Sequence, residues 1–107
     1  MSDPHELTAD EVADVVTEDA LGVYMLYADP EGSPSYVGRA EQVRSALLDH
    51  VDDYEAFWAD RMPNATAAYN KQVDLFHFHG GTEALDNDRH PQRPHKNVKC
   101  RHCDGDA

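Results

Sequence analysis

The stretch that decides the predicted fold is residues 21–38, which contain the runs Leu21-Gly22-Val23-Tyr24-Met25-Leu26-Tyr27 and Ser35-Tyr36-Val37-Gly38. The first run is apolar and aromatic and has the length of a β-strand. The residues between the runs, Asp29-Pro30-Glu31-Gly32-Ser33-Pro34, are rich in turn formers. We therefore expect a hairpin in which each strand carries one aromatic-glycine triplet, Gly22-Val23-Tyr24 and Tyr36-Val37-Gly38.

Helices are predicted on both sides of this hairpin. Upstream, Thr8 and Glu11 have the spacing of a capping box, and valines at helical spacing follow to about Glu18. Downstream, the apolar period changes to that of a helix that packs on the hairpin. Its buried face is expected to contain Val43, Ala46, Leu47, His50, Val51 and Tyr54.

The remaining elements complete an α+β domain. Residues 56–59 form a short aromatic run that predicts a third strand, ended by Met62-Pro63. Asn64 or Thr66 then caps a second helix that extends to about Phe78. We expect a three-stranded antiparallel sheet flanked by helices, with an N-terminal helix (1–19), a central domain (20–90) and an irregular basic tail with two cysteines (91–107).

The two triplets resemble those of the GIY-YIG nuclease family, and the resemblance covers about residues 20–90. His50, fourteen residues after Tyr36, agrees with the family pattern. So does Asn87, fifteen residues after Gln72, which stands at the family's metal-binding position. The resemblance implies a small α/β domain that hydrolyses phosphodiesters with one divalent cation such as Mg²⁺, with proton transfer by Tyr24 and Tyr36.

Two charged positions depart from the family pattern. Ala46 stands where the family has an arginine, and Gln72 stands where it has a glutamate. Arg44 lies about 200° around the helix from Ala46, which makes it a poor substitute, whereas Arg39 follows the second triplet directly. Because each lost charged group removes several kcal/mol of transition-state stabilisation, we expect cleavage to be lost or reduced. By resemblance, Gly38, Arg39 and Arg44 are the candidate substrate-binding residues.

Each candidate site residue also has a structural interpretation. Tyr24 and Tyr36 could pack in the core, and His50 could be a boundary histidine. Gln72 could bond the hairpin through its amide, and Asn87 could be a turn residue.

A second candidate site lies near the C-terminus. Cys100 and Cys103 are spaced as half of a tetrahedral zinc site. His90 and His79 are the histidines chosen to complete it, with His77 and His95 as further candidates. A structural zinc would fix an irregular tail, while a redox or free dithiol and no special role remain open alternatives.

The chain is strongly acidic, with 21 acidic and 9 basic residues and a formal charge of -12. This balance is typical of a halophilic archaeal protein. Five of the basic residues fall between Arg89 and Arg101, a local cationic patch that favours a nucleic acid partner. No stretch approaches the roughly 20 apolar residues of a membrane span, and the N-terminus does not resemble a signal peptide, so we expect a cytoplasmic protein without a membrane partner.

Three functions are compatible with the sequence. The first is a nucleic-acid-associated domain with impaired cleavage. The second is an active metal-dependent endonuclease in which Arg39 and tail residues replace the missing groups. The third is a zinc-stabilised protein-interaction module. The sequence leaves open the choice between DNA and RNA, the protein partner and the oligomeric state.

Overall fold

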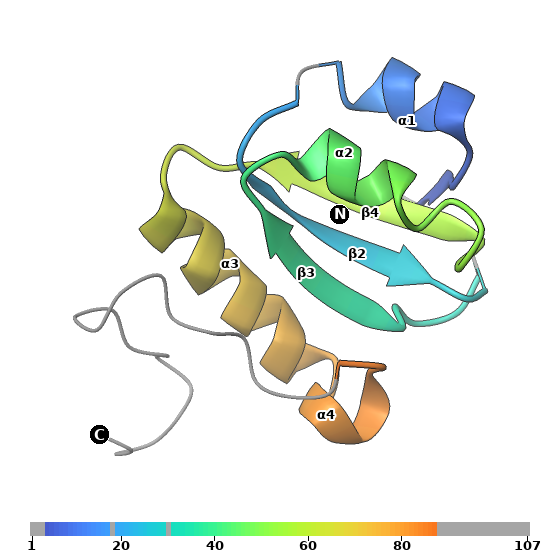
Figure 1. Ribbon diagram of the computed structural model, residues 1–107. Coiled ribbons are helices and arrows are strands. Elements are labelled where there is room, and N and C mark those ends of the chain that lie inside the picture. Colours follow the sequence, from blue (N-terminus) through green and yellow to red (C-terminus); the bar gives the residue numbers. More distant parts are fainter. Residues whose placement is uncertain (1–3, 18, 30, 88–107) are drawn as a thin grey trace.

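The fold is a four-stranded antiparallel sheet with helices on both faces (Figure 1). A computed structural model describes residues 4–17, 19–29 and 31–87. The strands are β1 (His5–Glu6), β2 (Gly22–Tyr27), β3 (Tyr36–Ala40) and β4 (Ala56–Arg61), in the order β1-β4-β2-β3. The helices are α1 (Ala9–Val15), α2 (Val43–Leu48), α3 (Ala65–Phe78) and α4 (Gly81–Ala84).

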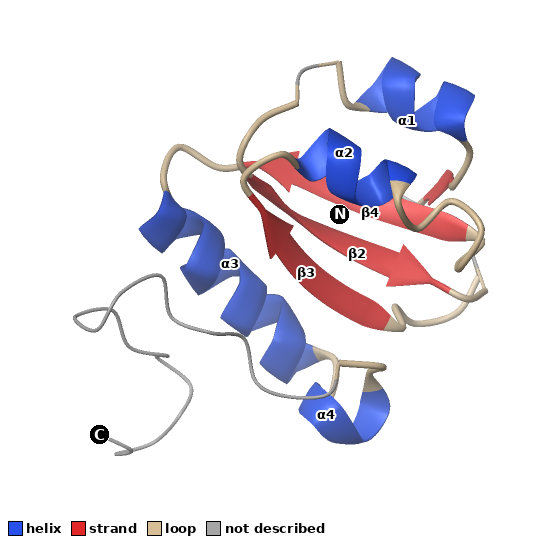
Figure 2. Cartoon of the chain, in the orientation of Figure 1, coloured by secondary structure: helices blue, strands red, loops and turns tan. Residues whose placement is uncertain are grey.

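The sheet separates two helical layers. Figure 2 shows α1 and α2 on one face of the sheet, with α3 on the other side. Two apolar clusters fill the space between the layers. The cluster toward α1 and α2 contains Leu7, Val12, Val16, Tyr24, Leu26, Val43, Leu47 and Phe57. The cluster toward α3 contains Val23, Met25, Tyr27, Val37, Ala56, Trp58, Ala68, Leu75, Phe76 and Leu85.

Strand β2 lies at the centre of the sheet. It pairs with β3 on one side and β4 on the other, and all six of its residues are buried. Because both faces are covered, the strand needs a continuous apolar run rather than an alternating one. Gly22 is required at its start, since a Cβ there would collide with the carbonyl oxygen of Asp60 in β4. The predicted hairpin and the α+β class are thus confirmed.

The sheet has four strands, whereas the sequence predicted three. The additional strand, β1, contains only two residues, His5 and Glu6, which pair with Phe57 and Ala56 at the outer edge of β4. The N–H of Leu7 extends this contact by donating to the carbonyl of Glu55, at 2.9 Å. A strand of two residues is too short for its polar-apolar alternation to be recognised in the sequence.

Helix α2 ends earlier than its apolar pattern predicts. It stops at Leu48, and a turn follows at residues 49–53. In this turn the N–H of His50 donates to Leu47 at 3.0 Å, and the N–H of Asp53 donates to His50 at 2.9 Å. Aspartates are unfavourable at a helix C-terminus because of the helix dipole, which explains the early end. The turn directs the chain toward β4 and positions His50.

Side-chain caps fix the starts of two helices. The hydroxyl oxygen of Thr8 accepts from the N–H of Glu11 at 3.1 Å, as the predicted capping box requires. Of the two residues considered for the start of α3, Asn64 is the cap, and its Oδ1 accepts from the N–H of Ala67 at 2.8 Å. The helix ends before Gly80 and Gly81, which have φ angles of 100° and 64°. Within the described part of the chain, no helix is long and apolar enough to cross a bilayer.

Candidate functional site

Four side chains form an aromatic cluster on the face of the sheet that α2 covers: Tyr24, Tyr36, His50 and Tyr54. The rings of Tyr24 and Tyr36 are stacked, with centroids 6.2 Å apart and an interplanar angle of 24°. The ring of His50 lies 6.3 Å from that of Tyr24 and 6.0 Å from that of Tyr36. Tyr54 meets His50 edge-on, with centroids 6.1 Å apart. The cluster therefore joins β2, β3 and the turn after α2.

The hairpin register explains why the two tyrosines meet. Tyr24 is paired with Gly38, and Tyr36 is paired with Leu26, so both tyrosines lie on the same face. Gly38 leaves room for the Tyr24 ring, because a Cβ at that position would lie 2.6 Å from the Tyr24 hydroxyl oxygen. The glycine of the second triplet and the tyrosine of the first are therefore complementary in shape.

Carboxylates surround the aromatic cluster. Asp53 Oδ2 lies 3.2 Å from His50 Nδ1, and Asp86 Oδ2 accepts a hydrogen bond from the Tyr54 hydroxyl at 2.9 Å. Asp49 adds negative charge near Tyr24. The local field is thus acidic, which disfavours direct contact between the cluster and a phosphate group.

The acidic and apolar surroundings make two of the phenols hard to ionise. Burial is the main cause that raises the pKa of Tyr24, with the neighbouring Tyr36 and Asp49 acting in the same direction. For Tyr54, burial and then the hydrogen bond to Asp86 raise the pKa to about 12. A general base must already be deprotonated near the working pH, so that it can accept a proton from the reacting group. Both phenols are therefore less suited to that role than a free tyrosine.

The basic residues chosen from the sequence make contacts elsewhere. The guanidinium of Arg39 lies 5.4 Å from the ring centre of Tyr69 in α3, the helix on the opposite face. Arg44 lies near Asp19, whose pKa is lowered by its hydrogen bond with Ser45 and more weakly by the Arg44 charge. Ala46, at the family's arginine position, packs against the apolar cluster beneath α2.

Asn87 is a clamp on the outer edge of β3. Its Oδ1 accepts from the N–H of Val37 at 3.0 Å, and its Nδ2 donates to the carbonyl of Val37 at 2.8 Å. Next to it, the N–H of Asp86 donates to the carbonyl of Ser35 at 2.6 Å. The Asn87 side chain and the Asp86 backbone thus replace a neighbouring strand, and together they hold β3 on both sides of Tyr36.

Gln72 is not joined to the aromatic cluster by a ring contact or a hydrogen bond within the described residues. It belongs to α3 and is only 7% exposed. Its Oε1 is buried and has no hydrogen-bond partner among the residues that the structure describes. The structure therefore brings together Tyr24, Tyr36 and His50, with Asn87 behind them, and leaves Gln72 on the helix that covers the other face.

The candidate zinc ligands are described only in part. His79 is the C-cap of α3, and burial lowers its pKa, which favours the neutral imidazole that binds metals. Cys100, Cys103, His90 and His95 lie outside the described residues. Among the side chains that the structure describes, no group of three or more metal-ligating residues is found.

Sequence reasoning did not select Tyr54, Asp53 and Asp86 as site residues. Tyr54 was expected on the buried face of a longer helix, so its approach to His50 depends on the turn that ends α2. Asp86 precedes Asn87, and its contact with Tyr54 follows from the clamp at β3. No local sequence signal distinguishes these two aspartates from the other acidic residues.

Comparison with protein-family models, with curated proteins and with solved structures finds no match. The resemblance to GIY-YIG nucleases therefore rests on the two triplets and on the spacing of His50 and Asn87.

Proposed function

We propose that the chain is a GIY-YIG-like domain that associates with nucleic acid and whose phosphodiester cleavage is lost or reduced. The observation that carries this proposal is the hairpin register, because it joins the tyrosines of both triplets to His50 in one cluster. A family resemblance based on short triplets requires that the two tyrosines share a face, and they do.

The chemistry of the cluster favours impaired cleavage. An active site for phosphodiester hydrolysis needs a cation to stabilise the developing charge and a group that exchanges protons near neutral pH. Asp49, Asp53 and Asp86 supply negative charge instead, and the pKa of Tyr24 is raised by burial. The contact of Arg39 with Tyr69 on the opposite face does not favour its use as a substitute arginine.

Affinity for nucleic acid would come from another part of the chain. Residues 1–87 contain 18 acidic and 4 basic side chains, whereas residues 88–107 contain 3 acidic and 5 basic ones. Lysine and arginine contacts with phosphates supply most non-specific affinity. The proposal assigns phosphate contacts to the segment from Arg89 to Arg101 and shape recognition to the aromatic cluster.

The test is a binding and cleavage assay on the whole chain in about 1 M KCl, where the screening length is about 3 Å. Labelled single strands and duplexes of DNA and RNA are incubated with and without Mg²⁺ and Mn²⁺. We expect binding without appreciable cleavage. Robust metal-dependent cutting that Tyr36→Phe abolishes would refute the impaired site, and absence of binding to all four nucleic acids would refute the association itself.

A zinc-stabilised interaction module is the second candidate. It is favoured by the lowered pKa of His79, since a neutral imidazole binds zinc without first losing a proton. Elemental analysis of protein purified without chelator provides the test. Zinc at one equivalent that Cys100→Ser removes supports the module, and metal-free protein with unchanged stability contradicts it.

A further inference from the structure

We propose that the aromatic cluster is a stacking platform for an unpaired nucleobase with neighbouring N–H donors, guanine being the best match. The preferred ligand is then a single strand rather than a duplex. This inference rests on the proposed association with nucleic acid and specifies the ligand class that the cluster selects.

The ring geometry favours a platform on which a ligand stacks over a cage of rings that encloses the ligand. Two rings that enclose a ligand must stand about 7–8 Å apart, twice the contact distance between non-bonded atoms. Tyr24, Tyr36 and His50 have centroid separations of 6.0–6.3 Å and interplanar angles of 24–38°. No group fits between such rings, so a ligand must lie on their outer side. A ligand that contacts rings from one side only is better matched by a planar base than by the tetrahedral ammonium group that aromatic cages enclose.

Exposure identifies the outer side of the platform. Tyr24 is only 5% exposed and forms the inner layer. Tyr36, His50 and Tyr54 are partly exposed, and the side chain of His50 retains 29% exposure. Tyr24 therefore supports the outer rings from beneath, and the outer rings are the ones that a ligand can reach.

The carboxylates that border the platform favour a base whose edge carries hydrogen-bond donors. Asp53, with 60% of its side chain exposed, and Asp86 accept hydrogen bonds but repel phosphates. Guanine presents N1–H and N2–H donors side by side, which match the two oxygens of a carboxylate. In a duplex these donors are already paired, so an unpaired base is required. This is why acidic surroundings, which oppose duplex binding, are compatible with base recognition.

The experiment measures binding of a GT-repeat strand, a CT-repeat strand and a duplex of GT with AC repeats to the whole chain at high NaCl concentration. The ring signals of the tyrosines in NMR spectra provide the readout, with guanosine as an uncharged probe. We expect the GT strand to bind most tightly and to shift the Tyr36 signals. Tyr36→Ala should weaken binding of the strand about 5- to 150-fold, the range for loss of one base stack.

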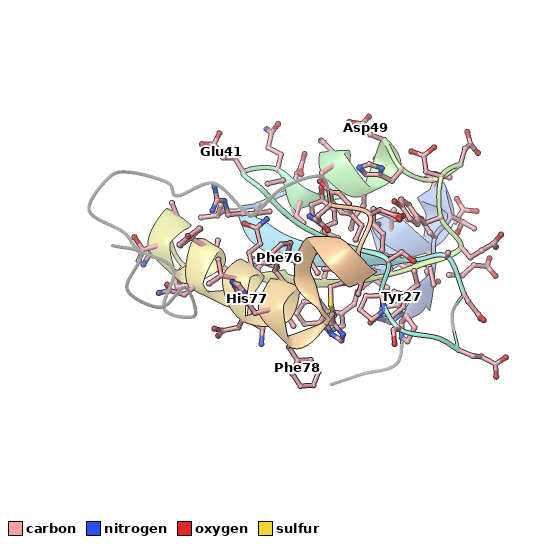
Figure 3. All side chains as sticks on the ribbon, turned by 90° about the horizontal axis from the view of Figure 1, so that it is seen from below. Tyr27, Glu41, Asp49, Phe76, His77 and Phe78 are labelled. Atoms are coloured by element: carbon pink, nitrogen blue, oxygen red, sulfur yellow. The ribbon has the colours of Figure 1, made fainter. Side chains whose placement is uncertain are left out.

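Four further substitutions separate stacking from other causes of binding. Tyr36→Phe keeps the ring and should keep the affinity, even though it removes the hydroxyl that hydrolysis would need. Phe78→Ala removes an aromatic ring that is 80% exposed and points away from the sheet on the side opposite Asp49 (Figure 3), and it should leave binding unchanged. Asp53→Asn and Asp86→Asn should reduce the preference for the GT strand over the CT strand.

Several results would overturn the inference. Binding of the strands that is unaffected by Tyr36→Ala would show that the cationic segment acts alone, in which case the proposed association with nucleic acid stands and the platform does not. Equal affinity for the duplex and the single strand would also refute the platform and leave the proposed association with nucleic acid in place. Displacement of the strand by an arginine-rich peptide that shifts the same tyrosine signals would identify a cation site instead. Absence of binding to any nucleic acid would refute the proposed function itself.

Discussion

At the scale of single residues, Gly38 determines whether the aromatic cluster can form. A Cβ at this position would lie 2.6 Å from the Tyr24 hydroxyl oxygen, so Gly38→Ala must displace a buried ring. We expect a loss of about 1–3 kcal/mol in the free energy of unfolding, the usual cost of overpacking. Denaturant titration of the two proteins measures this difference.

Gly32→Ala is the matched control for this substitution. Gly32 lies in the turn between β2 and β3, and the nearest atom to its added Cβ, at 3.6 Å, makes an ordinary contact. The control should be neutral or slightly stabilising. If Gly38→Ala were as stable as Gly32→Ala, the close approach of Tyr24 to Gly38 would be wrong.

Tyr54 makes the free energy of unfolding depend on pH in the alkaline range. Its pKa is raised from the ordinary value of 10 to about 12, so the unfolded chain loses this proton before the folded one does. Between pH 10 and pH 12 the folded state binds more protons, and the free energy of unfolding must fall as the pH rises. Unfolding by denaturant at a series of pH values measures the slope. Tyr54→Phe should make the slope shallower, and an unchanged slope would contradict the raised pKa.

The positions of single residues could be predicted from the sequence where they follow from local structure, above all from the hairpin. The tyrosines of the two triplets and Gly38 follow from strand alternation once the hairpin is assumed. The contact between Tyr54 and Asp86 could not be predicted, because it joins residues 32 positions apart through a clamp at the sheet edge. Long-range contacts of this kind leave no periodic pattern in the sequence.

At the scale of elements, the start of α3 depends on one side chain. Asn64 caps the helix through its hydrogen bond with the N–H of Ala67 at 2.8 Å. Asn64→Ala should reduce the free energy of unfolding by about 0.5–2 kcal/mol, whereas Asn64→Asp should retain most of it. Thermal and denaturant unfolding of the three proteins provides the comparison. Equal losses in both variants would mean that the hydrogen bond at the cap does not stabilise the helix.

Elements were predictable where their apolar pattern is long and were missed where it is short. Strands β2 and β3 and the 14-residue helix α3 were expected near their observed bounds. Strand β1 has two residues and α4 has four, so neither is long enough for its period to repeat. The end of α2 was misjudged because apolar residues continue at helical spacing beyond Leu48, while the aspartates around His50 favour a turn.

At the scale of the whole molecule, the surface charge should make stability depend on salt. The formal charge of -12 produces self-repulsion in the folded state, which salt screens. Raising KCl from about 0.1 to 1 M shortens the screening length from about 10 to 3 Å. We expect the midpoint of thermal unfolding, followed by circular dichroism, to rise by at least about 4 °C, which corresponds to about 1 kcal/mol.

An uncharged osmolyte is the control for screening. Sucrose strengthens apolar burial without changing the ionic strength, so it should raise the midpoint less than KCl over a matched range of water activity. Identical midpoints at low and high KCl would show that the acidic surface is not under electrostatic strain. They would also remove the physical reason for assigning the chain to a halophile.

The helical layers on the two faces of the sheet contain different optical reporters. Trp58, the single tryptophan, packs in the layer toward α3, with the ammonium of Lys71 5.9 Å from its ring centre. Emission excited selectively at the tryptophan band therefore follows the detachment of α3. The tyrosines report both faces, because Tyr27 and Tyr69 lie toward α3, whereas Tyr36 and Tyr54 lie toward α2. In stopped-flow traces, a tyrosine signal that still changes after the tryptophan signal is complete would show that the two layers separate in succession.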